Sequence, residues 1–148
     1  MSLNNIKSQF PIFAKKINGK PLVYLDSSNS SQKPLSVLKS LDHFYKNEFS
    51  NIGRSIHSLA VSATNKFDET RMNVKNFINA DSKEEIIFTK NATEAINLVA
   101  TTFGQQNIKK GDEILITELE HHSNYVPWHY LRETRGAIIK FAPINDEG

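Results

Sequence analysis

The segments IIF (86–88), EILIT (113–117) and AIIKFA (137–142) decide the fold that this sequence predicts. Each segment is short and rich in β-branched or aromatic residues, which is typical of buried strands. Helical patterns lie between them, so the predicted order is strand, helix, strand, helix, strand. That order is the pattern of a mostly parallel α/β sheet with flanking helices. In such sheets ligands bind at the carboxyl ends of the strands.

Two helices are predicted between these strands. The first has its apolar residues at helical spacing and is predicted to end at Gly104. The second is predicted over 126–135 and ends at Gly136, and a turn at 110–112 leads into the middle strand. The apolar positions of the first helix are Ile96, Val99, Ala100 and Phe103.

The first part of the chain has weaker signals. Residues 1–33 are predicted to be irregular, with a short helix around 3–9, a turn at Asn18-Gly19 and a short strand over 22–25. Pro34 suits the first turn of a helix, and a longer helix is predicted over 58–80 after a loop. Both helices carry an apolar stripe that we interpret as core packing. The stripes comprise Val37, Leu38, Leu41, Phe44 and Tyr45, and then Leu59, Ala63, Phe67, Val74 and Ile78.

Composition narrows the class of protein. The 148 residues carry a net charge of +2 that is spread along the chain, so we expect neither nucleic-acid nor membrane binding. There is no cysteine, which excludes disulfides, thiolate metal sites and a cysteine nucleophile within these residues. We see no signal peptide and no apolar run near the roughly 20 residues that span a bilayer. A cytoplasmic location is the expectation.

The loop after the first predicted strand, TKNATE (89–94), opens directly into a helix. Asn91 and Glu94 have the spacing of a capping box, so one interpretation is simply a well-capped helix. The other is an anion site, in which the N–H groups of Ala92, Thr93 and Glu94 and the helix dipole hold a phosphate. Spacing alone leaves both open.

The loop after the second predicted strand, ELEHHSN (118–124), holds two adjacent histidines beside acids. A metal site with His129 as third ligand is one interpretation, although neighbouring strand residues point to opposite faces. The others are a solvated pair, or one histidine that stacks on a ligand or transfers protons. A phosphate grip and a ring at adjacent strand ends would suit a phosphorylated heterocycle such as pyridoxal phosphate (PLP).

Several segments together resemble the SufS-type cysteine desulfurases of the class V aminotransferase group, which are fold-type I PLP enzymes. The resemblance runs from about residue 7 to residue 144. It rests on NGKPLVYLDS (18–27) with SQKP (31–34), RSIH (54–57), ATEAINL (92–98), EHHSN (120–124) and VPW (126–128).

The resemblance implies a role for each matching residue. Ala92 and Thr93 would bind the PLP phosphate, and His121 would stack on the pyridine ring and act catalytically as a proton carrier. Asn29 and Arg54 would be substrate-binding residues, with the 28–29 loop near the substrate carboxylate and Arg54 near the active-site mouth. The implied reaction converts L-cysteine to L-alanine and passes the sulfur, as a persulfide, to an acceptor protein for iron–sulfur cluster assembly.

Some family features differ or are missing. Gly53 stands where the family usually has histidine, Ser55 replaces a glycine, Ser28-Asn29 replaces an Ala-Ala pair, and Asn91-Ala92 replaces a Gly-Thr-like pair. No His-Lys motif and no cysteine occur, so covalent PLP binding is not expected in this chain. We therefore expect an N-terminal fragment that is not competent alone.

The resemblance also implies domains and assembly. Residues 1–57 would form an N-terminal arm with part of the small domain, and residues 58–148 an incomplete PLP-binding large domain. Alternatives are a class V enzyme with other chemistry, such as selenocysteine lyase, a non-enzymatic product that pairs with a full-length subunit, or a stand-alone phosphate-binding module. Uncovered sheet surface would favour association, so we expect a homo-oligomer.

Overall fold

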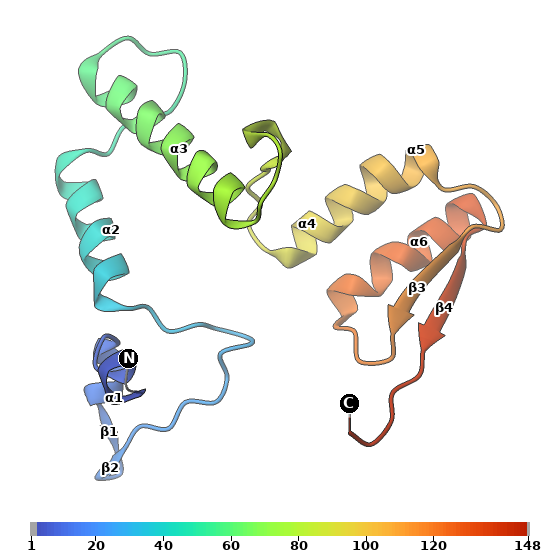
Figure 1. Ribbon diagram of the computed structural model, residues 1–148, viewed down its shortest axis with the longest axis horizontal. Helices are drawn as coiled ribbons and strands as arrows, with labels where there is room; N and C mark the ends of the chain where they lie inside the picture. Colours follow the sequence, from blue (N-terminus) through green and yellow to red (C-terminus); the bar gives the residue numbers. More distant parts are fainter. Residues whose placement is uncertain (1–2, 148) are drawn as a thin grey trace. The chain divides into compact units, whose positions relative to one another are not determined.

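The computed structural model describes residues 3–147 and separates into two compact units, with the division between Ile86 and Ile87 (Figure 1). Each unit is described by itself below. The predicted boundary after residue 57 concerns the domains of a longer protein, and it stays a prediction.

The first unit begins with four short elements: α1 (Leu3–Lys7), the 3-10 turn η1 (Pro11–Ala14), β1 (Lys16–Ile17) and β2 (Lys20–Pro21). The two strands form an antiparallel hairpin. Asn18 and Gly19 connect them with φ values of 51° and 76°, the two positive values that a tight hairpin turn requires. The predicted short helix and the predicted turn are therefore confirmed.

The strand predicted over 22–25 is wrong. Residues 22–25 join no ladder among the described residues; of their N–H groups, that of Leu22 donates to the carbonyl of Lys15 at 3.2 Å, just outside β1. Val23 and Leu25 are 75% and 91% exposed. An apolar run becomes a strand only where a neighbour receives its backbone hydrogen bonds.

The rest of the first unit is helical: α2 (Leu35–Asn47), α3 (Ser58–Phe77) and the 3-10 turn η2 (Lys83–Glu85). Pro34 is the N-cap of α2, one position before the predicted first turn. The Nδ1 atom of His57 caps α3 by accepting the N–H of Ala60 at 3.3 Å. Both predicted helices are present, and α3 ends three residues earlier than predicted.

Core packing of the two apolar stripes is largely wrong. No described side chain of α2 is buried, and α3 buries only Ala60 and Ala63. Leu41 and Leu59 on the predicted stripes are 50% and 48% exposed. An amphipathic stripe is buried only where a second layer covers it, and the first unit supplies little of one.

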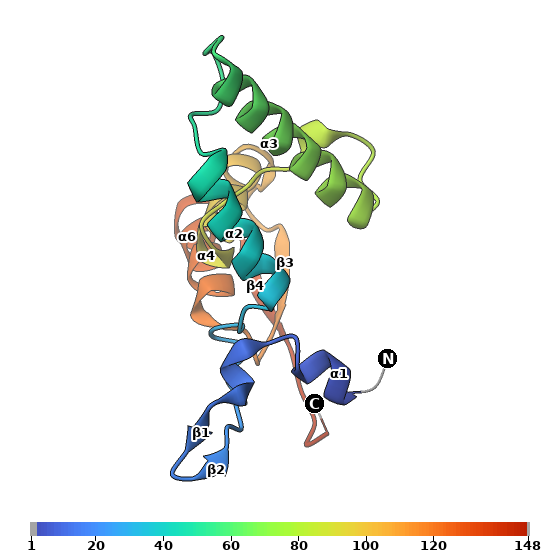
Figure 2. The same ribbon diagram turned by 90° about the vertical axis from the view of Figure 1, so that its left-hand side faces the viewer.

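The second unit contains α4 (Ala92–Val99), the π-turn η3 (Ala100–Gly104), α5 (Gln105–Asn107), β3 (Glu113–Thr117), the 3-10 turn η4 (His122–Asn124), α6 (Val126–Arg135) and β4 (Ile138–Ala142). β3 and β4 pair in parallel, with Glu113 opposite Ile138 and Thr117 opposite Ala142. They lie side by side in both views (Figure 1, Figure 2), and α6 connects them. The predicted strand–helix–strand unit is confirmed.

The strand predicted over 86–88 is wrong in the structure. Ile86 has extended backbone, with φ −91° and ψ 113°, but the segment pairs with no strand within residues 3–147. The sheet of the second unit therefore has two strands where three are predicted. Extended conformation alone does not make a strand without a ladder partner.

The predicted helix end at Gly104 is also wrong, because the helix continues through η3 into α5. Gly104 has helical backbone, with φ −60° and ψ −49°. A Cβ atom at this position would lie 2.6 Å from Cδ1 of Leu131. Glycine is thus placed here for close packing of two helices and not for ending one.

The core of the second unit is small and lies between its helices and the sheet. Leu131 is completely buried together with Ala100 and Ala137. The residues packed against these three are Ile108, Ile114 and Trp128. Of the helices described, none is long and apolar enough to cross a membrane.

Gly136 ends α6 as predicted. Its φ of 72° is left-handed, and its N–H donates to the carbonyl of Arg132 at 3.0 Å. Its own carbonyl accepts the N–H of Gly111 at 3.0 Å, which connects the end of α6 to the turn before β3. A left-handed residue at this position is the usual way to satisfy the last carbonyls of a helix.

Candidate cofactor site

The N-terminus of α4 is capped on both sides. Asn91 Oδ1 accepts the N–H of Glu94 at 2.9 Å, and Glu94 Oε2 accepts the N–H of Lys90 at 2.6 Å. The predicted capping box is therefore present, with Glu94 bonded one residue before the N-cap. Thr89 Oγ1 also donates to the carbonyl of Asn91 at 3.2 Å, which holds the loop against the helix start.

Two backbone donors remain at this helix start. No acceptor within the described residues binds the N–H groups of Ala92 and Thr93, which are exposed. The first-turn N–H groups of a helix have no intrahelical partner, and they carry the positive end of its dipole. The capped-helix and anion-site interpretations are thus compatible, because the cap uses Glu94 and leaves two donors for an anion.

A network of polar side chains holds the loop after β3. Thr117 Oγ1 donates to Glu120 Oε1 at 2.8 Å, and Asn124 Nδ2 donates to Glu120 Oε2 at 2.7 Å. Trp128 Nε1 in turn donates to Asn124 Oδ1 at 2.9 Å. Hydrogen bonds from Asn124 and then Thr117 lower the pKa of Glu120 from its ordinary value. The loop is therefore fastened to β3 at one end and to α6 at the other.

His121 lies at the centre of this loop, as the N-cap of η4. Its Nδ1 accepts the backbone N–H of Ser123 at 3.2 Å and lies 3.0 Å from the Ser123 hydroxyl. The ring is exposed and stands edge-on to that of His122, with the two centroids 6.1 Å apart. Nδ1 is thus engaged within the loop, and Nε2 is the nitrogen left for a ligand.

A metal site at these histidines has no support from the structure. Within residues 3–147 there is no group of three or more side chains placed to hold a metal ion. His129 belongs to α6, where its ring packs on Tyr125 with centroids 4.2 Å apart. Its Nε2 is buried without a hydrogen-bond partner among the described residues.

The predicted site residues fall into the two units. In the second unit α4 contacts η4, so the helix that begins with Ala92 and Thr93 adjoins the turn that His121 caps. Asn29 and Arg54 belong to the first unit, where both are exposed on loops. The structure thus brings the predicted cofactor residues into one unit and leaves the predicted substrate residues in the other.

The loop that carries Asn29 is ordered by its own side chains. The Tyr24 hydroxyl donates to the carbonyl of Ser30 at 2.5 Å and lies 3.1 Å from the carbonyl of Asp26, its alternative acceptor. Asn29 Nδ2 lies 3.4 Å from Asp26 Oδ2. Tyr24 is a residue that sequence analysis missed, because nothing in an apolar run shows that a tyrosine hydroxyl will clamp the following loop.

The Glu120–Asn124–Trp128 network was also missed as a structural unit. The three residues are four apart, and this spacing could have predicted that their side chains meet across successive turns of the chain. Ser123 has no comparable signal, because its contact depends on the turn that η4 makes.

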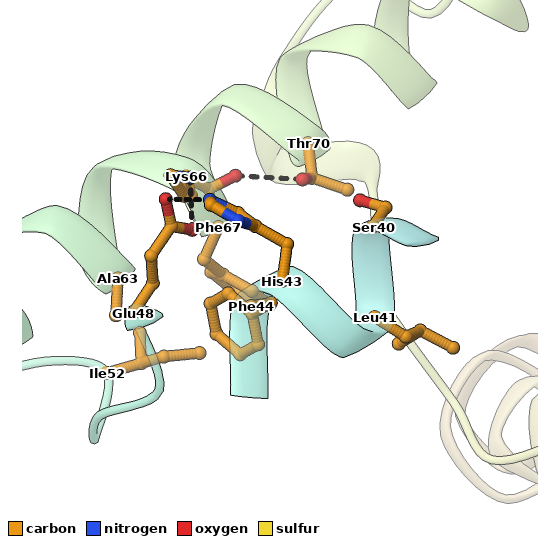
Figure 3. Close-up of a pocket in the computed structure, with 10 residues that line it drawn as sticks. All are labelled: Ser40, Leu41, His43, Phe44, Glu48, Ile52, Ala63, Lys66, Phe67 and Thr70. Carbon is orange, nitrogen blue, oxygen red and sulfur yellow. Dashed lines mark hydrogen bonds and ion pairs between the residues drawn. The ribbon is translucent and has the colours of Figure 1, made fainter. Parts of the chain in front are cut away.

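A hollow of about 350 Å³ lies between α2 and α3 in the first unit (Figure 3). Its polar side is an ion pair between Glu48 and Lys66, with His43 Nε2 at 3.4 Å from Glu48 Oε1. The bond from Lys66 is the main cause of a lowered pKa at Glu48. This group joins the end of α2 to α3, which gives it a structural role.

Loss of the Glu120 network in acid is a testable consequence of this geometry. Because the pKa of Glu120 in the folded chain is below its ordinary value of 4.5, its carboxylate stabilises the loop above pH 4.5. That contribution is lost as the pH falls through the lower folded value. We expect Trp128 fluorescence, from the single tryptophan of the chain, to change in this acid range.

Two variants provide the comparison. Glu120→Gln should weaken the acid transition and leave Trp128 in its low-pH state at neutral pH. Glu118→Gln, a change at an exposed acid of the same loop, should keep the wild-type profile. An unaltered transition in Glu120→Gln would show that another group titrates.

Comparison with known proteins shows the family of this chain. The family described as "Aminotransferase class-V" matches residues 23–148. A probable cysteine desulfurase of Synechocystis sp. is 49% identical over 142 residues, which make up 96% of this chain and 34% of the relative. One of Halalkalibacterium halodurans is 45% identical over 148 residues, 100% of this chain and 36% of the relative.

Solved structures show the same relationship. The apo cysteine desulfurase of Thermococcus onnurineus NA1 matches with a TM-score of 0.87 and 34% identity, over 100% of this chain and 35% of that one. A cysteine desulfurase of Escherichia coli matches with a TM-score of 0.74 and 31% identity, over 99% and 35%. The chain thus spans about a third of the length of these relatives. The predicted fold class, part of a fold-type I PLP-enzyme large domain, is confirmed, and the chain belongs to the class-V aminotransferase family.

Proposed function

We propose that this chain is the N-terminal part of a SufS-type, PLP-dependent cysteine desulfurase. The complete protein would convert L-cysteine to L-alanine and pass the sulfur to an acceptor protein for iron–sulfur cluster assembly. The observation that carries the proposal is the contact of α4 with η4, which joins two free backbone donors and an exposed imidazole in one unit. The names of the relatives support the same activity.

The residues of this chain would contact the phosphate of the cofactor and one face of its pyridine ring. Ala92 and Thr93 would donate their N–H groups to the phosphate, and the exposed His121 ring would stack on the pyridine. PLP, when bound, supplies an electron sink for the substrate's α-carbon. In the complete protein, Asn29 and Arg54 would be substrate-binding residues, with the 28–29 loop near the substrate carboxylate and Arg54 near the active-site mouth. No cysteine is present in the sequence, so the sulfur-accepting nucleophile would belong to another part of the complete protein.

A second candidate keeps the fold and changes the chemistry, for example to a selenocysteine lyase. It is favoured by the substrate loops, where Ser28-Asn29, Gly53 and Ser55 replace the residues usual in the family. A third candidate is a non-enzymatic chain that pairs with a full-length subunit. The many exposed apolar side chains, such as Leu41 and Leu115, support association and a homo-oligomer. A cytoplasmic location remains part of the proposal.

Cofactor binding can be tested on the chain itself with pyridoxine 5′-phosphate, which has no aldehyde and so does not react with lysines. We expect calorimetry to show that this compound binds and that pyridoxine binds at least about ten times more weakly. The reason is that a phosphate held by backbone donors contributes roughly 1.5–3 kcal/mol to the free energy of binding. Inorganic phosphate should compete. Equal affinity for both compounds would contradict the phosphate assignment to Ala92 and Thr93.

The reaction is tested on a protein extended to the length of the relatives. Release of alanine from L-cysteine, with the persulfide sulfur released as sulfide by an added thiol reductant, is the expected result, at a higher kcat/KM than the corresponding reaction of selenocysteine. A preference for selenocysteine would support the second candidate. No turnover of either substrate, with PLP bound, would contradict both enzymatic proposals.

A further inference from the structure

We propose that Ser123 is a positioning residue that fixes the tautomer and orientation of His121, so that Nε2 is the nitrogen that meets a bound cofactor. This inference rests on the proposed function for the identity of the cofactor. The tautomer itself is a property of the chain and can be measured without any ligand.

The backbone N–H of Ser123 determines which nitrogen of His121 accepts a hydrogen bond. An amide N–H can only donate, so the Nδ1 atom that it meets at 3.2 Å must offer its lone pair. A neutral imidazole has one protonated nitrogen, and its proton must then be on Nε2. The Ser123 hydroxyl, 3.0 Å from the same Nδ1, can donate to it as well.

The turn around His121 keeps this arrangement in place. Asn124 donates its N–H to the carbonyl of His121 at 2.8 Å, and Tyr125 donates to that of His122 at 3.1 Å. Glu120 and Asn124 are joined by a 2.7 Å hydrogen bond that passes across the loop. Hydrogen bonds therefore hold the chain on both sides of His121, and Ser123 contacts the ring itself.

The two ring nitrogens of His121 therefore have different roles. Nδ1 is used by the loop, while Nε2–H is on the edge of an exposed ring. A ring held in this way offers its face for stacking and a single N–H for hydrogen bonding. His122, the neighbouring residue, has no such bond to its ring nitrogens among the described residues, and its ring stands at 85° to that of His121.

The test is the nitrogen-15 NMR spectrum of the imidazoles in the unliganded chain at neutral pH. We expect His121 to show the Nε2–H form more completely than His122. His57 is a positive control, because its Nδ1 accepts the N–H of Ala60 in the same manner. A predominantly Nδ1–H form of His121, or the same tautomer ratio as His122, would overturn the proposal.

Variants separate the hydroxyl from the backbone. Ser123→Ala keeps the backbone N–H donor and removes only the hydroxyl. The His121 tautomer ratio should therefore move part of the way toward that of His122, and pyridoxine 5′-phosphate binding should weaken about threefold to tenfold, the effect of one hydrogen bond. Ser123→Thr should restore both. His122→Gln should alter neither the tautomer of His121 nor its response to Ser123→Ala. If Ser123→Ala leaves the ratio and the affinity unchanged, the hydroxyl has no positioning role and the proposal for Ser123 fails.

Measurements of ligand binding and of the His121 tautomer distinguish the identity of the cofactor from the role of Ser123. If pyridoxine 5′-phosphate binds to none of these proteins while His121 shows the Nε2–H form and responds to Ser123→Ala, the proposed cofactor is wrong and the positioning role stands. If the compound binds and the tautomer is Nδ1–H, the cofactor assignment stands and the positioning role is wrong.

Discussion

Truncation of Leu131 to alanine should lower the free energy of unfolding of this chain by about 3 kcal/mol, the usual cost of a cavity in a packed core. Leu131 is the one large side chain among the described residues that is completely buried. It packs with Ala100 and Ala137, and Trp128 lies against this cluster. Denaturant unfolding followed by Trp128 fluorescence measures the change. Leu115→Ala, at a leucine that is 70% exposed in β3, is the matched control and should cost less than about 1 kcal/mol.

The effect of Gly104→Ala on the free energy of unfolding should change sign when Leu131 is replaced by alanine. In the wild-type chain Gly104→Ala should be destabilising or close to neutral, since overpacking costs about 1–3 kcal/mol and alanine in a helix gains about 1 kcal/mol over glycine. In the Leu131→Ala background the same change should be stabilising. The reason is that the Cβ clash, at 2.6 Å from Cδ1 of Leu131, is gone and the methyl group enters the cavity. Equal effects of Gly104→Ala in both backgrounds would show that the two residues are not in contact.

Replacement of Ala92 by proline should weaken the binding of pyridoxine 5′-phosphate about tenfold to a hundredfold, the expected loss of one hydrogen bond to a charged group. Ala92 is the first residue of α4, where proline fits the helix and removes only an N–H that has no intrahelical acceptor. Asn91 before it has extended backbone, which suits a residue that precedes proline. Calorimetric titration measures the affinity.

Two comparisons decide what the Ala92→Pro result means. Ala92→Ser keeps the N–H and the small size, so its affinity should stay near that of the wild type. Unfolding followed by Trp128 fluorescence should show nearly unchanged stability for both variants. Wild-type affinity in a folded Ala92→Pro protein would mean that this N–H does not bind the phosphate.

Local signals in the sequence predicted the elements that local interactions determine. Asn18-Gly19 predicted a hairpin turn, Gly136 predicted a helix end, and Asn91 with Glu94 predicted a capped helix start. Each is present in the structure. Turns and helix caps depend on a few neighbouring residues, so they can be predicted from the sequence before the fold is known.

The wrong predictions concern elements whose structure depends on residues distant in the sequence. Residues 22–25 and 86–88 have the composition of strands, yet neither has a neighbour to pair with in the described residues. Gly104 has the position of a helix end, and its role in contact with Leu131 appears only when two helices are packed together. Apolar stripes predict which face a helix would bury, and they do not supply the layer that covers it.

For the candidate site, the sequence by itself determined the residue types and their order along the chain: a capped helix start with two free donors, and a histidine after the following strand. Only the tertiary structure decided that α4 contacts η4 and that Ser123 donates a hydrogen bond to Nδ1 of His121. The physical reason is that N–H donors and imidazoles are properties of single residues. Their meeting in one place, and the choice of the nitrogen that remains available, depend on how the backbone turns between them.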